Sequence, residues 1–152
     1  GNVARLAQQV NALAATVSGA KLPKFSCTDT SGNTVSSAEI TKAAVGVIYL
    51  WASWNYESTE MQRRLKQMKD KAGNKLCVIG FSVDAAQASC NSFLERDSVK
   101  WSNVCDGLMF ESKTVRTLGL YSIPSNILLK NGKIIERNIS SQELMRKLEE
   151  LL

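Results

Sequence analysis

Two apolar runs with an amphipathic segment between them constrain the fold of this 152-residue chain more than any other feature. Residues 44–51 and 76–83 are almost continuously apolar, which is typical of strands buried on both faces of a sheet. Between them, apolar residues recur at helical spacing and predict a helix from about Ser58 to Ala72. A strand, a helix and a second strand in this order predict a right-handed crossover between parallel strands.

Shorter patterns on both sides of this unit predict the rest of a single α/β domain. A turn-forming cluster at residues 29–33 indicates a hairpin within residues 24–35. A second hairpin is predicted where Asn131-Gly132 joins the alternating segments 127–130 and 133–137. Parallel crossover units followed by an antiparallel edge predict a mixed central β-sheet with helices on both faces.

The remaining expected elements complete this domain, which we place at residues 21–152. An amphipathic helix in residues 1–20 precedes it. The others are a short helix ending near Lys42, a helix at 85–96 capped by Asp84, a third parallel strand or extended connector at 101–105, a helix at 111–118, and a terminal helix after the capping residue Ser140.

The composition excludes several classes of function. The chain contains no histidine, which excludes Ser-His-Asp and Cys-His catalysis and most zinc sites. Its four cysteines are scattered and match no zinc or iron–sulfur spacing, so we expect no metal and no cofactor. The net charge of +5 is modest and is not concentrated in basic runs, so we expect no nucleic-acid partner. No apolar run approaches the roughly 18–20 residues that span a bilayer, so we expect no transmembrane segment.

Residues 51–58 carry the most specific motif, Trp-Ala-Ser-Trp-Asn-Tyr-Glu-Ser. It resembles the Trp-Ala-Ser-Trp-Cys-x-x-Cys active-site turn of bacterial thioredoxin-like proteins. Further matches are Leu22-Pro23-x-Phe25, residues 79–84 (Ile-Gly-Phe-Ser-Val-Asp), residues 122–125 (Ser-Ile-Pro-Ser) and residues 131–135 (Asn-Gly-Lys-Ile-Ile). In this order and spacing, they resemble the thioredoxin fold of TlpA/ResA-type thiol-disulfide oxidoreductases and AhpC/TSA-related proteins, with a leading helix and an N-terminal hairpin added.

This resemblance implies a site whose usual chemistry is missing. In the family the first cysteine attacks as a thiolate, but Asn55 and Ser58 stand where the two cysteines belong, and neither can make a mixed disulfide. We therefore expect no catalytic residue here. Instead, Asn55 and Ser58 are expected to cap the following helix, with Glu57 near its positive end. These residues form the pseudo-active site, defined as Trp54, Asn55, Tyr56, Glu57 and Ser58.

The resemblance also marks a loop that faces the pseudo-active site. Pro124 corresponds to the family's cis-proline, and Ile123 precedes it. In the family, backbone groups beside this proline pair with an extended substrate segment, which is a form of strand addition. With Tyr56 and Trp54 as exposed contacts, the resemblance implies a protein or peptide partner at this face. Trp51, in contrast, is expected in the core.

The cysteines are interpreted one by one. Cys77 and Cys90 are expected in the core because they lie among apolar residues. Cys27 and Cys105 lie nearer the ends of elements, where exposure is expected, and are the candidates for reactive thiols. A structural disulfide among the four stays open, and the sequence does not name its pair.

Three functions stay open at this point. The first is a thioredoxin-like domain without the redox dithiol that binds a protein or peptide in bacterial envelope redox chemistry or folding. The second is a thiol-disulfide oxidoreductase or peroxidase that uses a cysteine outside the motif, such as Cys27 or Cys105. The third is a structural domain of a larger envelope protein. The resemblance alone implies a location in the bacterial periplasm or cell envelope.

Overall fold

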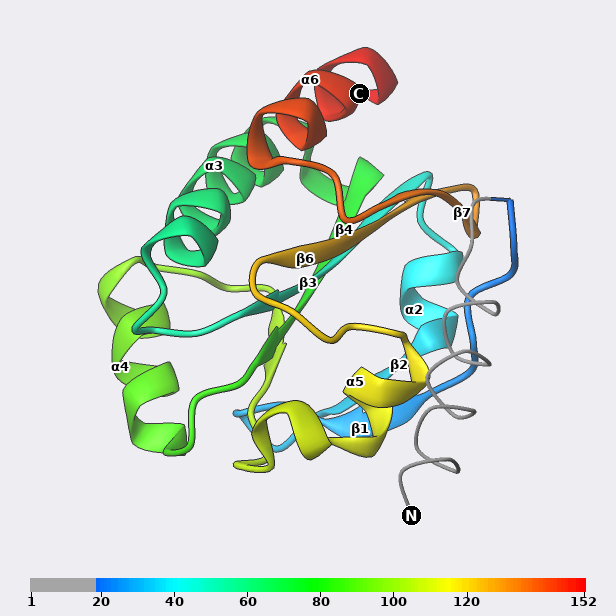
Figure 1. The fold of residues 1–152 in the computed structure, drawn as a ribbon. Helices are drawn as coiled ribbons and strands as arrows, with labels where there is room; N and C mark the ends of the chain where they lie inside the picture. The colour runs from blue at the N-terminus through cyan, green and yellow to red at the C-terminus, as the bar shows by residue number, and fades with distance from the viewer. Residues whose placement is uncertain (1–18) are drawn as a thin grey trace.

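A mixed five-stranded sheet forms the centre of residues 19–152, which are the residues that this computed structural model describes (Figure 1). The helix expected in residues 1–20 falls almost wholly outside them. The strand order is β5–β4–β3–β6–β7, where β3, β4 and β5 are parallel and β6 and β7 are antiparallel to their neighbours. The strands are β3 (Val45–Trp51), β4 (Leu76–Ser82), β5 (Ser102–Val104), β6 (Ser125–Lys130) and β7 (Lys133–Arg137). The predicted α/β class and mixed sheet are therefore confirmed.

Helices cover both faces of the sheet, as predicted (Figure 1). One face carries α3 (Tyr56–Ala72), α4 (Gln87–Arg96) and α6 (Ser141–Leu151). The other carries α2 (Ser37–Thr41), α5 (Lys113–Thr117) and the hairpin of β1 (Ser26–Thr28) and β2 (Thr34–Ser36). Two 3-10 turns, η1 (Gly73–Lys75) and η2 (Met109–Glu111), complete the described elements.

Alternation along β3 divides the core into two layers. Ile48 and Leu50 point to the layer of α2 and α5, whereas Tyr49 and Trp51 point to the layer of α3, α4 and α6. All seven residues of β3 are buried, which is the reason for its continuous apolar run. Trp51 is in the core, as expected, and its Nε1 donates to Asn103 Oδ1 at 2.7 Å.

Several boundaries differ from the prediction. Helix α3 begins at Tyr56, two positions before the expected Ser58, because Asn55 caps it. Residues 111–118 do not form one helix: η2 and α5 divide the segment at Ser112. The prediction that Asp84 caps the next helix is wrong. Helix α4 begins at Gln87, and the Asp84 carboxylate lies buried against polar groups of Ser53 and Ser82.

Candidate functional site

The pseudo-active site begins in the turn between β3 and α3. The backbone N–H of Asn55 donates to the Ala52 carbonyl oxygen at 3.1 Å, which closes the turn. Asn55 Oδ1 then accepts from the backbone N–H of Ser58 at 2.8 Å, so the predicted capping role of Asn55 is confirmed. The amide oxygen of Asn55 therefore satisfies one of the backbone N–H groups that the start of α3 leaves without a helical partner.

Ser58 is fully buried and serves the turn rather than the helix end. Its Oγ donates to the Asn55 carbonyl oxygen at 2.9 Å and accepts from the Ala52 N–H at 3.2 Å. The prediction that Ser58 caps the helix is therefore wrong, because Ser58 lies within the first turn of α3 and its hydroxyl bonds back to residues before the helix. This hydroxyl both donates to and accepts from backbone groups of the turn, so the side chain has a purely structural environment.

Asp84 fastens this turn to the end of β4. Its carboxylate accepts from the Ser53 N–H at 3.1 Å and from the Ser53 hydroxyl at 2.7 Å. The Ser82 hydroxyl donates to the second oxygen at 2.7 Å. Asp84 is only 2% exposed, so this buried carboxylate is stabilised by charge-assisted hydrogen bonds. No local sequence pattern around Asp84 indicates this role.

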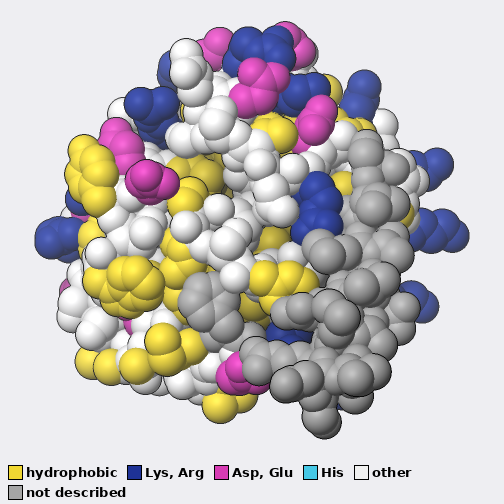
Figure 2. All heavy atoms as spheres, in the orientation of Figure 1, with side chains coloured by type: hydrophobic (Ala, Val, Ile, Leu, Met, Phe, Trp, Pro, Cys, Tyr) yellow, Lys and Arg dark blue, Asp and Glu magenta, His cyan; other side chains and the backbone are white. Residues whose placement is uncertain are grey.

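Two aromatic side chains of the pseudo-active site reach solvent. Trp54 is 63% exposed and Tyr56 is 73% exposed, and together they define the aromatic patch. Glu57 is also exposed in the first turn of α3. Figure 2 shows hydrophobic side chains at the surface around the turn that precedes α3. Exposed aromatic side chains are the type of residue that anchors protein partners.

The loop after β5 extends this apolar surface. Cys105 Sγ donates to the Asp84 carbonyl oxygen at 3.5 Å, which holds the loop beside the turn that Asp84 fastens. Leu108 and Met109, further along this loop, are exposed large apolar residues. Sequence reasoning missed both of them, and their only signal was an apolar pair following the turn-forming Asp106-Gly107.

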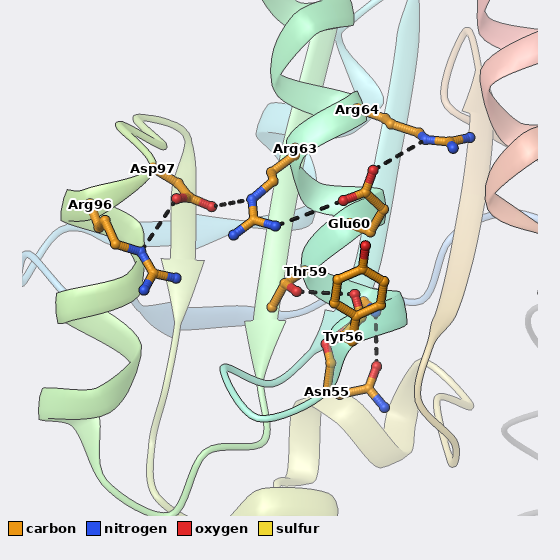
Figure 3. A network of polar contacts seen from close by, with 9 residues as sticks. Asn55, Tyr56, Thr59, Glu60, Arg63, Arg64, Arg96 and Asp97 are labelled. Carbon is orange, nitrogen blue, oxygen red and sulfur yellow. Dashed lines mark hydrogen bonds and ion pairs between the residues drawn. The ribbon is translucent and has the colours of Figure 1, made fainter.

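A network of charged side chains flanks the aromatic patch on α3 and α4 (Figure 3). Arg63 lies between Glu60 on its own helix, at 3.7 Å, and Asp97 at the end of α4, at 3.0 Å. The Arg96 guanidinium lies 4.5 Å from the centroid of the Phe93 ring. Such exposed pairs contribute little to stability individually, but they place charges of both signs along the rim of the patch.

Pro124 lies at the end of the sheet where the turn begins. The Ile123–Pro124 peptide bond is cis, as the resemblance implied. Ser125, the next residue, opens β6 and pairs with Leu50 near the end of β3. Because of this register, Ile123 and Pro124 lie at the same end of the central strands as Ala52 and the pseudo-active site. Both residues are partly exposed.

The four cysteines are thiols and all lie in the described part of the chain. Cys90 is buried, as expected, but Cys77 is only partly buried. The expectation that Cys105 is exposed is wrong: it is 7% exposed because its loop folds back onto Asp84. Cys27 is partly buried, and its pKa is raised above the usual 9.0 by burial and then by Asp106, Asp29 and Glu39. Such a shift disfavours the thiolate that a reactive cysteine needs.

The described residues contain no group of three or more acidic, cysteine or histidine side chains placed to hold a metal ion. Within residues 19–152, no helix has the length and apolar character needed to cross a membrane.

The sheet order, the cis-proline loop and the motif turn at the start of α3 together define a thioredoxin-fold protein of the thiol-disulfide oxidoreductase class. A sequence model of the AhpC/TSA family matches residues 18–137, and the chain belongs to this family. No relative is found among curated proteins.

Solved structures support the same class. A thiol-disulfide oxidoreductase from Bacteroides fragilis is 30% identical with a TM-score of 0.75, over 87% of this chain and 99% of that one. The C-terminal domain of a thiol-disulfide oxidoreductase from Bacteroides thetaiotaomicron is 29% identical with a TM-score of 0.74, over 90% and 96% of the two chains. A secreted disulfide oxidoreductase from Mycobacterium tuberculosis shares the fold, with 16% identity and a TM-score of 0.70 over 83% and 95%.

Proposed function

We propose that this chain is a thioredoxin-like domain that lacks the redox dithiol and binds a protein or peptide without redox turnover. The observation that carries the proposal is the environment of Asn55 and Ser58. Both side chains are engaged in the hydrogen bonds that close the turn and start α3, and neither side chain holds sulfur. The position of the attacking thiolate is therefore occupied by a helix cap.

The surface around this cap favours binding. The aromatic patch is exposed beside a polar and charged rim, which is the arrangement of an interface core with its surroundings. Ile123 and Pro124 lie at the same edge and offer backbone groups for pairing with an extended segment. A peptide that lies along this edge would meet Trp54 and Tyr56 with its side chains.

A redox role for a cysteine outside the motif has less support. Cys105 is buried, and burial raises the pKa of Cys27, so neither candidate thiol combines access with a favoured thiolate. We further propose that the domain acts in the bacterial cell envelope. In support, the neighbour from Mycobacterium tuberculosis is described as secreted.

The first test asks whether the scaffold lacks only its two thiols. In an insulin-reduction assay with dithiothreitol, we expect the wild-type chain to give no turnover above background. The double variant Asn55→Cys/Ser58→Cys is expected to catalyse the reaction, because it restores a dithiol at the start of α3. The matched control Asn55→Cys has only one thiol in the turn and should remain inactive. Wild-type turnover that is lost in Cys27→Ser or Cys105→Ser would overturn the non-catalytic assignment.

The second test concerns the aromatic patch. Peptides selected against the wild-type domain from a random phage-displayed library should bind Tyr56→Ala at least about tenfold more weakly, as an anchoring aromatic requires. The thermal midpoint should stay nearly unchanged because Tyr56 is exposed. Gln142→Ala, an exposed position on α6, is the matched control and should bind like wild type. Equal peptide affinities for Tyr56→Ala and the control would exclude this surface.

A further inference from the structure

The exposed apolar surface extends beyond the aromatic patch onto the loop after β5. Among the residues that the structure describes, the large apolar side chains that are clearly exposed are Trp54, Tyr56, Leu108 and Met109. On the face shown in Figure 2, apolar side chains reach the surface over both the turn before α3 and the loop that carries η2. A single exposed apolar residue needs no explanation, but several on adjoining loops indicate an interaction surface.

The segment that joins β4 to α4 brings these two loops together. The turn before α3 is hydrogen-bonded to this segment through Ser53, the residue before Trp54. Gly107, the residue before Leu108, approaches the same segment closely, since a Cβ atom there would lie 3.5 Å from the Ala85 carbonyl oxygen. The aromatic patch and the exposed apolar residues of the loop after β5 therefore adjoin one short segment.

The same end of the sheet lacks positive charge in its connections. Strands β3, β4 and β5 end there and β6 begins there, so four connections meet at this end. They comprise residues 52–55, 83–86, 105–112 and 118–124. None of them contains lysine or arginine, although the chain has 19 such residues and a net charge of +5. This end is therefore less positive than the rest of the molecule.

Carboxylates lie beside the exposed apolar residues instead. Glu57 is exposed and directly follows Tyr56, and Asp106 is exposed two positions before Leu108. Glu111 in the same loop pairs with Arg116 at 3.2 Å, so its charge is largely balanced. A surface that is apolar and negatively charged is complementary to a partner that is apolar and positively charged.

We propose that the partner at this surface is a protein segment in which aromatic or other apolar side chains stand next to lysine or arginine. Its apolar side chains contact the aromatic patch and Leu108, and its basic side chains lie near Glu57 and Asp106. The apolar contacts supply most of the affinity, whereas the charges select the partner. This partner chemistry rests on the peptide binding proposed above and adds to it a charge requirement and a second loop.

The phage-displayed library described above tests this chemistry, and failures of the two proposals give different results. We expect the selected peptides to carry lysine or arginine next to an apolar residue at least about twice as often as the unselected library. Selected peptides without this excess would overturn the charge requirement and leave the proposed function standing. A selection that yields no binding peptide would overturn both.

Neutral variants test the two carboxylates. Glu57→Gln/Asp106→Asn removes two charges and keeps the side-chain shapes, so a selected basic peptide should bind at least about fivefold more weakly at low salt. The difference should shrink at high salt because exposed charges are screened. Glu39→Gln/Glu149→Gln removes two exposed charges from α2 and α6 and is the matched control. Equal affinities of the two double variants would overturn the proposal.

Further measurements test the second loop and the other occupants. Leu108→Ala should weaken binding of the same peptide at least about threefold and leave the Tm nearly unchanged, because Leu108 is exposed. Wild-type affinity in this variant would remove the loop from the surface and overturn the proposal. Two results that are lost in Trp54→Ala would also overturn it: sedimentation with phosphatidylcholine–phosphatidylglycerol vesicles would assign the surface to lipid, and dimerisation in sedimentation velocity would assign it to a second copy.

Discussion

At the scale of single residues, the Asn55 amide satisfies a backbone donor at the start of α3. A helix start leaves backbone N–H groups without partners, and an anion or an accepting side chain can satisfy them. Asn55 Oδ1 accepts from the Ser58 N–H, and the Ser58 hydroxyl bonds back to the Asn55 carbonyl oxygen. The two side chains therefore support each other, and they hold the turn without a sulfur atom at either position.

The cap has a measurable effect on stability. Asn55→Ala removes the side-chain acceptor of the Ser58 N–H, and we expect a loss of about 1 kcal/mol in the free energy of unfolding. Urea denaturation monitored by circular dichroism measures this loss. Gln67→Ala, an exposed substitution in the middle of α3, is the control and should change the value by less than about 0.5 kcal/mol. Equal stabilities of the two variants would mean that the cap contributes nothing.

At the scale of elements, Asp84 joins the ends of two parallel strands. Val83 N–H donates to the Trp51 carbonyl oxygen at 2.9 Å, and the Asp84 carboxylate then accepts from Ser53 just beyond β3. The turn that carries the aromatic patch is thus held against β4 as well as by its own helix. Trp54 and Tyr56 are thus exposed on a turn that is held from two sides, which would lower the entropic cost of the partner binding that we propose.

Replacement of this carboxylate should loosen the turn. Asp84→Asn keeps the shape but puts an amide NH₂ opposite donors of Ser53 or Ser82, and we expect a loss of about 1–3 kcal/mol in the free energy of unfolding. Asp70→Asn removes an exposed partner of Lys66 and should cost at most about 1 kcal/mol. Chemical denaturation of both variants gives the comparison. A loss for Asp84→Asn no larger than for Asp70→Asn would show that the carboxylate is dispensable.

Asp84 also shows where sequence reasoning reaches its limit. The buried strands, the hairpin at Asn131-Gly132 and the cap of α6 follow from local patterns, and the structure confirms them. Asp84 stands before a helix, where a cap is the local expectation, but its partner Ser53 lies 31 positions earlier.

At the scale of the whole molecule, an apolar layer covers each face of the central sheet, and titratable side chains are buried or partly buried in both layers. Burial raises the pKa of Tyr49 far above its usual 10.0 and raises those of Cys27 and Cys77 above 9.0. Burial has the same effect on Tyr121. These groups lie on different elements, so their effect on stability is spread over the fold rather than confined to one site.

The raised pKa values of these tyrosines and cysteines predict a loss of stability in alkali. Above the unfolded-state pKa, the unfolded chain releases protons that the folded chain retains, so the free energy of unfolding falls as the pH rises. We expect the fall to begin near pH 9 with the thiols and to steepen above pH 10, where Tyr49 alone adds up to about 1.4 kcal/mol per pH unit. Urea denaturation at pH 8 to 11.5, with reductant present, measures the slope.

Variants at two tyrosines show whether Tyr49 causes the fall in the free energy of unfolding above pH 10. Tyr49→Phe should be less stable at pH 8, because Gln62 and Trp101 lose their hydroxyl partner, but its decline above pH 10 should be shallower than that of wild type. Tyr56→Phe removes an exposed hydroxyl and should keep the wild-type slope. If the Tyr49→Phe slope equals that of wild type, the Tyr49 proton is not retained by the fold, and the alkaline loss must come from the thiols and Tyr121.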